Sequence, residues 1–197
     1  VHGICSVGMD GTIDHLMVRV ENLEESIEWY ENAFDYTEVR GRVEAETFTN
    51  VFLAPANRPP DSAYLELTYN HDGRSYDMGN AWDHFAVTVS DVEEAFEELT
   101  DKGVVPHDST TIEDPDSVYI VDPDGHKIQL VETDSGTDWS LDHVTWNVTN
   151  IDESIGWLIR KFEYEFARRV EENGHAMYRL RANGAPAETF FMELRPT

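Results

Sequence analysis

An apolar residue, an aspartate and a histidine occur together three times along this chain. After each histidine, apolar residues recur 8, 12 and 15 positions later, which is the spacing of one face of a helix. The three segments and their apolar residues are Ile13-Asp14-His15 with Leu23, Ile27 and Tyr30; Trp82-Asp83-His84 with Val92, Phe96 and Leu99; and Leu141-Asp142-His143 with Ile151, Ile155 and Leu158. This regularity predicts one supersecondary unit used three times, with a candidate metal ligand at the start of each.

Each unit is expected to begin with a strand that leads into a helix. In the first unit, every second residue of 16–20 is apolar, which predicts a strand with one apolar face and His15 on the other. Asn22 can cap the following helix, whose apolar stripe would pack on that strand. Short strand-like runs follow at 37–44, 47–53 and 64–68. The predicted order is therefore β-α-β-β-β.

The last strand of each unit is predicted to place an oxygen-bearing side chain on the same open face as the histidine. Leu65 and Leu67 would face the helix, so Glu66 between them points to the opposite side. The same alternation applies to the other two units. The predicted pairs are His15 with Glu66, His84 with Gln129, and His143 with Glu193. Two pairs carry a carboxylate, and the middle one carries an amide.

The chain is strongly acidic, with 40 Asp and Glu against 14 Lys and Arg in 197 residues. A net charge of −26 spread along the sequence would repel nucleic acid and anionic membranes, so neither is expected as a partner. High salt would screen the self-repulsion, so the composition also favours a halophilic protein. Cys5 stands alone and no run of apolar residues approaches a membrane span or a secretion signal, so a cytoplasmic location is expected.

Several segments carry a resemblance to a known family. Paired βαβββ modules with a histidine on the first strand and a glutamate on the last resemble the vicinal oxygen chelate superfamily, which is the glyoxalase, bleomycin resistance and dioxygenase fold. Within it, residues 13–132 resemble glyoxalase I, and a third module is appended. The segments that carry this likeness are Leu65-Glu66-Leu67-Thr68-Tyr69-Asn70, then Tyr76, Gly79 and His84, then Asp122-Pro123-Asp124-Gly125-His126-Lys127-Ile128.

The resemblance implies an α+β fold in which two βαβββ modules pair to form a cup around a metal ion. The expected divisions of the chain are an N-terminal arm at 1–11, modules at 12–70, 81–132 and 140–197, and linkers at 71–80 and 133–139. Three modules leave one cup half without a partner in the chain, which favours a homodimer that pairs the spare modules.

The resemblance also implies a glyoxalase I-like lyase, which converts the hemithioacetal of methylglyoxal and a small thiol to a 2-hydroxyacyl thioester. The family's metal ligands carry over onto His15, Glu66 and His84, and its fourth ligand, a glutamate that can also act as catalytic base, falls on Gln129. Glu66 is therefore the expected catalytic residue of this chain. One divalent ion per site, of nickel, cobalt, zinc or manganese, would suit nitrogen and oxygen ligands of this kind. Arg19 and Asn70 fall on positions that the family uses for the γ-glutamyl end of the thiol.

Gln129 departs from the family, which has a glutamate there. A glutamine can bind a metal through its amide oxygen, but it has no useful basicity. Three outcomes stay open: Glu66 is the sole base, the third module replaces the second by supplying His143 and Glu193, or the chain binds without catalysing.

The thiol and the reaction class leave further alternatives. Where the family often has basic residues, this chain has Asn80 and the acidic segment 113–116, which would receive a glycyl carboxylate poorly. A shorter thiol such as γ-glutamylcysteine is therefore expected in place of glutathione. Alternative functions are a non-catalytic cup that binds a small molecule, and an extradiol-type dioxygenase with a two-histidine, one-carboxylate iron site for which Glu193 could supply the carboxylate.

Overall fold

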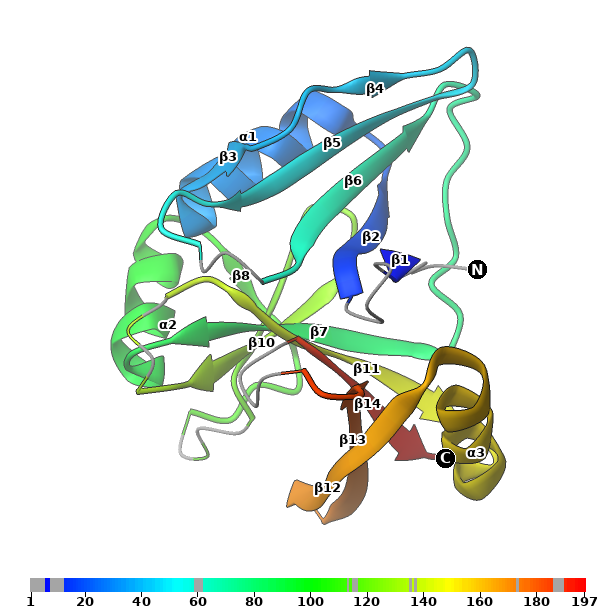
Figure 1. The fold of residues 1–197 in the computed structure, drawn as a ribbon. Helices are drawn as coiled ribbons and strands as arrows, with labels where there is room; N and C mark the ends of the chain where they lie inside the picture. Colours follow the sequence, from blue (N-terminus) through cyan, green and yellow to red (C-terminus); the bar gives the residue numbers. More distant parts are fainter. Residues whose placement is uncertain are drawn as a thin grey trace.

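Three segments of the chain repeat one order of strands and a helix (Figure 1). The computed structural model describes residues 6–7, 13–58, 62–112, 114, 117–134, 136, 138–172, 174–185 and 190–197. The first repeat contains β2 (Ile13–Val20), α1 (Leu23–Phe34), β3 (Tyr36–Glu38), β4 (Val43–Glu44), β5 (Phe48–Pro55) and β6 (Tyr64–Asn70). The second contains β7 (Trp82–Val89), α2 (Val92–Asp101), β8 (Val105–Pro106), β9 (Tyr119–Val121) and β10 (Lys127–Glu132). The third contains β11 (Leu141–Val148), α3 (Ile151–Phe162), β12 (Tyr164–Glu172), β13 (His175–Ala182) and β14 (Phe191–Pro196).

A short strand, β1 (Ser6–Val7), precedes the first repeat. The rest of the predicted arm at 1–11, including Cys5, lies outside the described residues. The expected fold class is confirmed, because the described residues form an α+β structure built from repeated βαβββ modules.

Side-chain caps fix the first turn of every helix. Asn22, Asp91 and Asn150 each accept a hydrogen bond from the backbone N–H three residues later, at 3.4, 2.9 and 3.1 Å. The cap predicted at Asn22 is thus confirmed. α1 and α3 also end alike, because Asp35 and Glu163 both adopt the left-handed conformation, with φ of 52° and 56°. The first and third repeats therefore share their helix boundaries in detail.

The strands form two sheets, which we call sheet A and sheet B. Sheet A holds the first repeat in the order β1-β2-β6-β5-β3, with β4 also paired to β5. Sheet B joins the second and third repeats in the order β12-β13-β14-β11-β7-β10-β9-β8. Its two halves meet at the antiparallel pair of β7 and β11, each the first strand of its repeat. In every repeat the first and last strands are parallel neighbours, which sets each histidine close to the last strand.

The strand expected at 37–44 is divided in the structure. Its two parts, β3 and β4, pair with opposite ends of β5. The residues between them, 39–42, are all exposed and have no apolar face to bury. The continuous strand was therefore wrong: beyond the hydrogen bond from Val39 N–H to Phe52 O, the exposed side chains of this stretch bury no surface that would keep it in the sheet.

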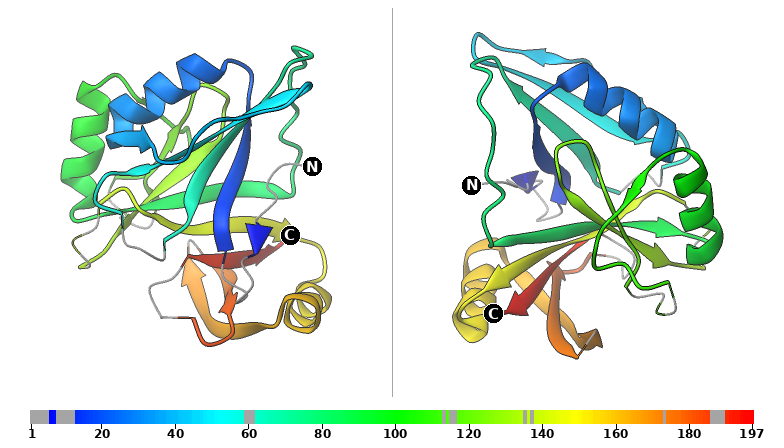
Figure 2. Two further views of the ribbon diagram at one scale, coloured as in Figure 1. Left: turned by 45° about the horizontal axis from the view of Figure 1, so that its top comes forward. Right: turned by 180° about the vertical axis from the view of Figure 1, so that it is seen from behind.

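The buried apolar side chains form one cluster with members from all three repeats. α1 lies against the second repeat and the segment that follows it: the Tyr30 hydroxyl donates to Asp122 at 2.7 Å, and Phe34 stacks on Trp139 with ring centres 5.0 Å apart. α3 lies apart from α1 and α2, beyond the other half of sheet B (Figure 2). Its Trp157 side chain stays 49% exposed. Among the described residues, no helix has the length and apolar character needed to cross a membrane.

Candidate metal centre

The structure brings together each of the three predicted histidine and oxygen pairs. The distances are 2.7 Å from His15 Nε2 to Glu66 Oε2, 3.0 Å from His84 Nε2 to Gln129 Oε1, and 3.9 Å from His143 Nε2 to Glu193 Oε1. Each pair joins the first strand of a repeat to its parallel neighbour, the last strand, so strand alternation alone was enough to predict it.

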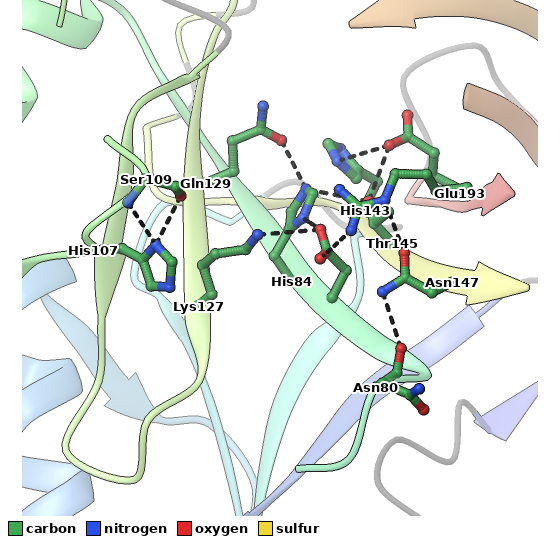
Figure 3. A network of polar contacts seen from close by, with 12 residues as sticks. Asn80, His84, His107, Ser109, Lys127, Gln129, His143, Thr145, Asn147 and Glu193 are labelled. Atoms are coloured by element: carbon green, nitrogen blue, oxygen red, sulfur yellow. Dashed lines mark hydrogen bonds and ion pairs between the residues drawn. The ribbon is translucent and has the colours of Figure 1, made fainter. Parts of the chain in front are cut away.

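Two of the pairs converge on one face of sheet B. In the antiparallel register of β7 and β11, Thr145 lies opposite His84 and Ala86 lies opposite His143, so both histidines share one face. Ligand atoms of His84, His143 and Glu193 all lie within 4.8 Å of one another, and all three residues are buried. Figure 3 shows this group at the seam of the two modules, with Gln129 on the far side of His84.

The structure does not assemble the set of four expected from the sequence. His15 and Glu66 lie on sheet A, in a pocket of about 310 Å³ whose lining residues come from β2, β5 and β6. The reason is strand pairing. β7 pairs with β11 and not with β2. The edge of β2 pairs instead with β1, at Ile13 and His15. His84 and Gln129 therefore face the third module, the source of the alternative residues His143 and Glu193.

The predicted thiol contacts, Arg19 and Asn70, line the same pocket of the first module as His15 and Glu66. Asn70 donates its side-chain N–H to the Tyr76 hydroxyl at 2.5 Å, and the Arg19 guanidinium lies 5.5 Å from the Tyr76 ring centre. Of the acidic segment 113–116, only residue 114 is described. The polar residues expected to bind the thiol are thus grouped on sheet A.

His84 presents an unprotonated nitrogen to the cluster. Burial lowers its pKa to about 4, so the imidazole is neutral at pH 7 and carries one N–H. Its Nδ1 lies 2.6 Å from Asp83 Oδ2, and a carboxylate can only accept, so the proton belongs on Nδ1. Nε2 then directs a lone pair at Gln129 Oε1, 3.0 Å away, and at Thr145 Oγ1, 3.2 Å away. The Thr145 hydroxyl donates its own proton to Glu193 Oε1 at 3.0 Å.

His143 and Glu193 also offer atoms that can bind a metal ion. His143 Nδ1 faces Asp142 Oδ2 at 2.7 Å, while its buried Nε2 has no hydrogen-bond partner among the described residues. Burial alone would raise the pKa of Glu193, but neighbouring positive charge, with the Arg179 guanidinium and its hydrogen bond, outweighs burial and holds that pKa below its usual value. Glu193 is therefore a carboxylate. Two imidazole nitrogens, a carboxylate and an amide oxygen converge here, and this donor set fits a divalent ion.

The pair in the first module is satisfied without an ion. His15 faces Asp14 through Nδ1 at 3.0 Å and Glu66 through Nε2 at 2.7 Å. Burial tends to lower the pKa of His15, but these two carboxylates outweigh it and raise the pKa. Asn50 and Thr68 also donate to Glu66 Oε1. His15 thus bridges two carboxylates at hydrogen-bond distance, whereas His143 Nε2 lies 3.9 Å from Glu193 Oε1.

Two residues of the cluster were missed in the sequence. Thr145 lies two positions after His143 on the same strand, so alternation alone could have found it. Arg179 lies opposite Glu193 in the β13–β14 register and donates Nε–H to its Oε2 at 2.7 Å. Its place depends on which strands pair, and no local pattern contains that information.

Comparison with known proteins places the chain in a family. Residues 12–130 match the Glyoxalase/Bleomycin resistance protein/Dioxygenase superfamily. A lactoylglutathione lyase of Neisseria meningitidis is 37% identical over 133 residues, covering 63% of this chain and 92% of the relative.

Plant proteins match most of this chain. A putative lactoylglutathione lyase of Brassica oleracea is 28% identical over 91% of this chain, which spans only 64% of the length of that relative. The crystal structure of glyoxalase I from Zea mays superposes with a TM-score of 0.79 at 24% identity, covering 93% of this chain and 66% of the maize chain. The chain thus belongs to the Glyoxalase/Bleomycin resistance protein/Dioxygenase superfamily, within which it is a glyoxalase I-like member with three βαβββ repeats.

Proposed function

We propose that the chain is a metal-dependent glyoxalase I-like lyase that works in the cup formed by the second and third modules. The observation that carries the proposal is the convergence of His84, His143 and Glu193, with the Gln129 amide oxygen beside them. The substrate is the hemithioacetal of methylglyoxal and a small thiol, and the product is a 2-hydroxyacyl thioester. The relatives named lactoylglutathione lyase support this reaction class.

The residues of the cup divide the chemistry among them. A bound divalent ion, of nickel, cobalt, zinc or manganese, would polarise the two oxygens of the substrate. The Glu193 carboxylate is the group that can take the proton from the carbon bearing sulfur and return it to the neighbouring carbon. Arg179 and Thr145 each bond one of its two oxygens, so the carboxylate is held in one orientation. Gln129 supplies an oxygen ligand without basicity.

Glu193 thus takes the catalytic role that the sequence suggested for Glu66. Glu66 and His15 form half of a ligand set in the first module, and the other half has to come from a further module. Arg19 and Asn70 remain candidates for thiol binding in that pocket. If the half-set is completed, the molecule contains a second site of the same kind.

We also propose a short thiol, γ-glutamylcysteine, and a cytoplasm of high salt as the setting of the reaction. The net charge of −26 supports a high-salt setting, because salt screens the repulsion between the acidic side chains. A thiol substrate has to stay reduced, which supports the cytoplasm as the compartment. The test is isomerase turnover in multimolar salt, with methylglyoxal and either γ-glutamylcysteine or glutathione. We expect faster turnover with γ-glutamylcysteine, and a clear preference for glutathione contradicts the thiol assignment.

Metal analysis of the same protein separates the alternative functions. We expect about one divalent ion in each sheet B cup, together with isomerase activity. A bound ion without isomerase activity would instead favour the dioxygenase alternative, since two histidines and one carboxylate also form the ligand set of non-haem iron oxygenases. A protein that binds neither nickel, cobalt, zinc, manganese nor iron would favour a small-molecule binding cup.

We propose that a second copy of the chain covers the outer face of the third module. Trp157 and Phe162 of α3 are 49% and 37% exposed, although Phe34, which takes the place of Phe162 in α1, is fully buried. The equivalent position is thus buried in α1, where Phe34 packs on Trp139, and exposed in α3. Light scattering after gel filtration should give the mass of a dimer, and Trp157→Glu should return it to the mass of one chain. A monomeric wild-type protein at micromolar concentration excludes the dimer.

A further inference from the structure

We infer that Asp83 and Asp142 are positioning residues for the metal, each fixing the tautomer of the histidine that follows it in sequence. The inference rests on metal binding in the proposed function and does not depend on isomerase turnover. It gives a physical reason for the repeated Asp-His pair, in which the aspartate had no assigned role.

The same contact occurs in all three repeats. The distances from histidine Nδ1 to the preceding aspartate Oδ2 are 3.0 Å at His15, 2.6 Å at His84 and 2.7 Å at His143. Neighbouring side chains on a strand normally point to opposite faces, so strand geometry by itself does not produce this contact. In each repeat, the other nitrogen, Nε2, is the one that faces the oxygen side chain of the last strand.

Basic side chains hold the aspartate of the second repeat in place. Lys127 Nζ lies 3.2 Å from Asp83 Oδ2, and Arg195 donates to Asp83 Oδ1 at 2.6 Å. Arg195 belongs to the third module, where it also donates to Asn147 at 2.8 Å. Asp83 is therefore fixed from both sides of the seam between the modules, and its orientation depends on their being joined.

A metal-binding imidazole must offer a lone pair, and a neutral imidazole has only one. With the carboxylate at Nδ1, the proton stays there and Nε2 is free for the ion. Without it, the proton can move to Nε2 and block the ligand position, and the ring loses its anchor. Loss of such a partner typically weakens metal binding by about 10–100-fold.

The test combines variants with a direct reading of the tautomer in the full chain. Zinc affinity, measured by competition with a chelating dye, is expected to fall about 10–100-fold in Asp83→Ala and in Asp142→Ala. Asp83→Asn retains an oxygen acceptor, so its zinc affinity should lie between that of the alanine variants and that of the wild type. Asp101→Asn removes one negative charge at the exposed end of α2 and should leave the affinity within about two-fold.

Nitrogen-15 NMR of the metal-free wild-type protein reads the tautomers without any substitution, so it answers the question even if a variant fails to fold. We expect His84 and His143 to be protonated at Nδ1 and not at Nε2. Protonation at Nε2 in either histidine, or zinc affinities in the alanine variants equal to that of Asp101→Asn, overturns the inference. Neither readout uses the isomerase reaction, so a chain without turnover still tests it.

Discussion

Glu193→Gln is expected to lower turnover by about 10²–10⁴-fold, which is the range that a general base contributes. The amide keeps an oxygen for the ion and for the Arg179 hydrogen bond, so it removes basicity while the fold is retained. Alanine would be a poorer choice, because it would leave the half-buried Arg179 guanidinium without its carboxylate partner. The measurement is kcat with the hemithioacetal, on protein whose metal content has been determined.

The matched control is Glu66→Gln, the same change at the equivalent position of the first module. Because Glu66 lies on sheet A and Glu193 on sheet B, this variant should keep turnover within about two-fold of the wild type. If Glu66→Gln lost activity and Glu193→Gln did not, the working base would belong to the first module. The ion of sheet B would then be structural.

Gln129→Glu is expected to raise turnover by about 10-fold or more and to tighten metal binding. The new carboxylate would stand where the amide oxygen is now, 3.0 Å from His84 Nε2, and would complete a set of two histidines and two carboxylates. A second carboxylate offers the substrate a base on the other side of the ion. The measurement is kcat and metal affinity side by side with the wild type.

Without metal, Gln129→Glu is expected to be less stable than the wild type. Without an ion, a buried carboxylate would face the His84 lone pair and stand near Glu193, so the metal-free form should melt at a lower temperature than metal-free wild type. Gln129→Met, which fills similar space without an oxygen, separates this charge effect from packing and should lose affinity. A Gln129→Glu protein that binds metal tightly but turns over more slowly contradicts the expected gain.

Much of the site could be predicted from single strands. The alternation of polar and apolar residues places Glu66, Gln129 and Glu193 on the face of their histidines, because these relations involve residues a few positions apart and one parallel neighbour. Single strands do not reveal which two of the three histidine and oxygen pairs meet. That convergence depends on the pairing of β7 with β11. The sequence of β2 has the same pattern as that of β11, so the pattern alone does not say which of the two pairs with β7.

The residues found only in the structure share one property: each has its role because of a contact with a residue on another strand. Arg179 is an ordinary basic residue of β13 until β14 sets Glu193 opposite it. Arg195 gains its contact with Asp83 only because the second and third modules share a sheet. Long-range pairing of this kind involves no periodicity along the chain, so a sequence pattern cannot reveal it.

The register of the β7–β11 seam has a consequence for how this protein can change over time. The pairing is regular from His84 to Ala86 and is interrupted by register shifts on both sides. Moving either strand by one residue would send one histidine to the opposite face while leaving the backbone hydrogen bonds of the sheet possible. Insertions and deletions can therefore be tolerated at the interruptions but not between them. A lineage that lost the ion could relax this spacing without losing the sheet.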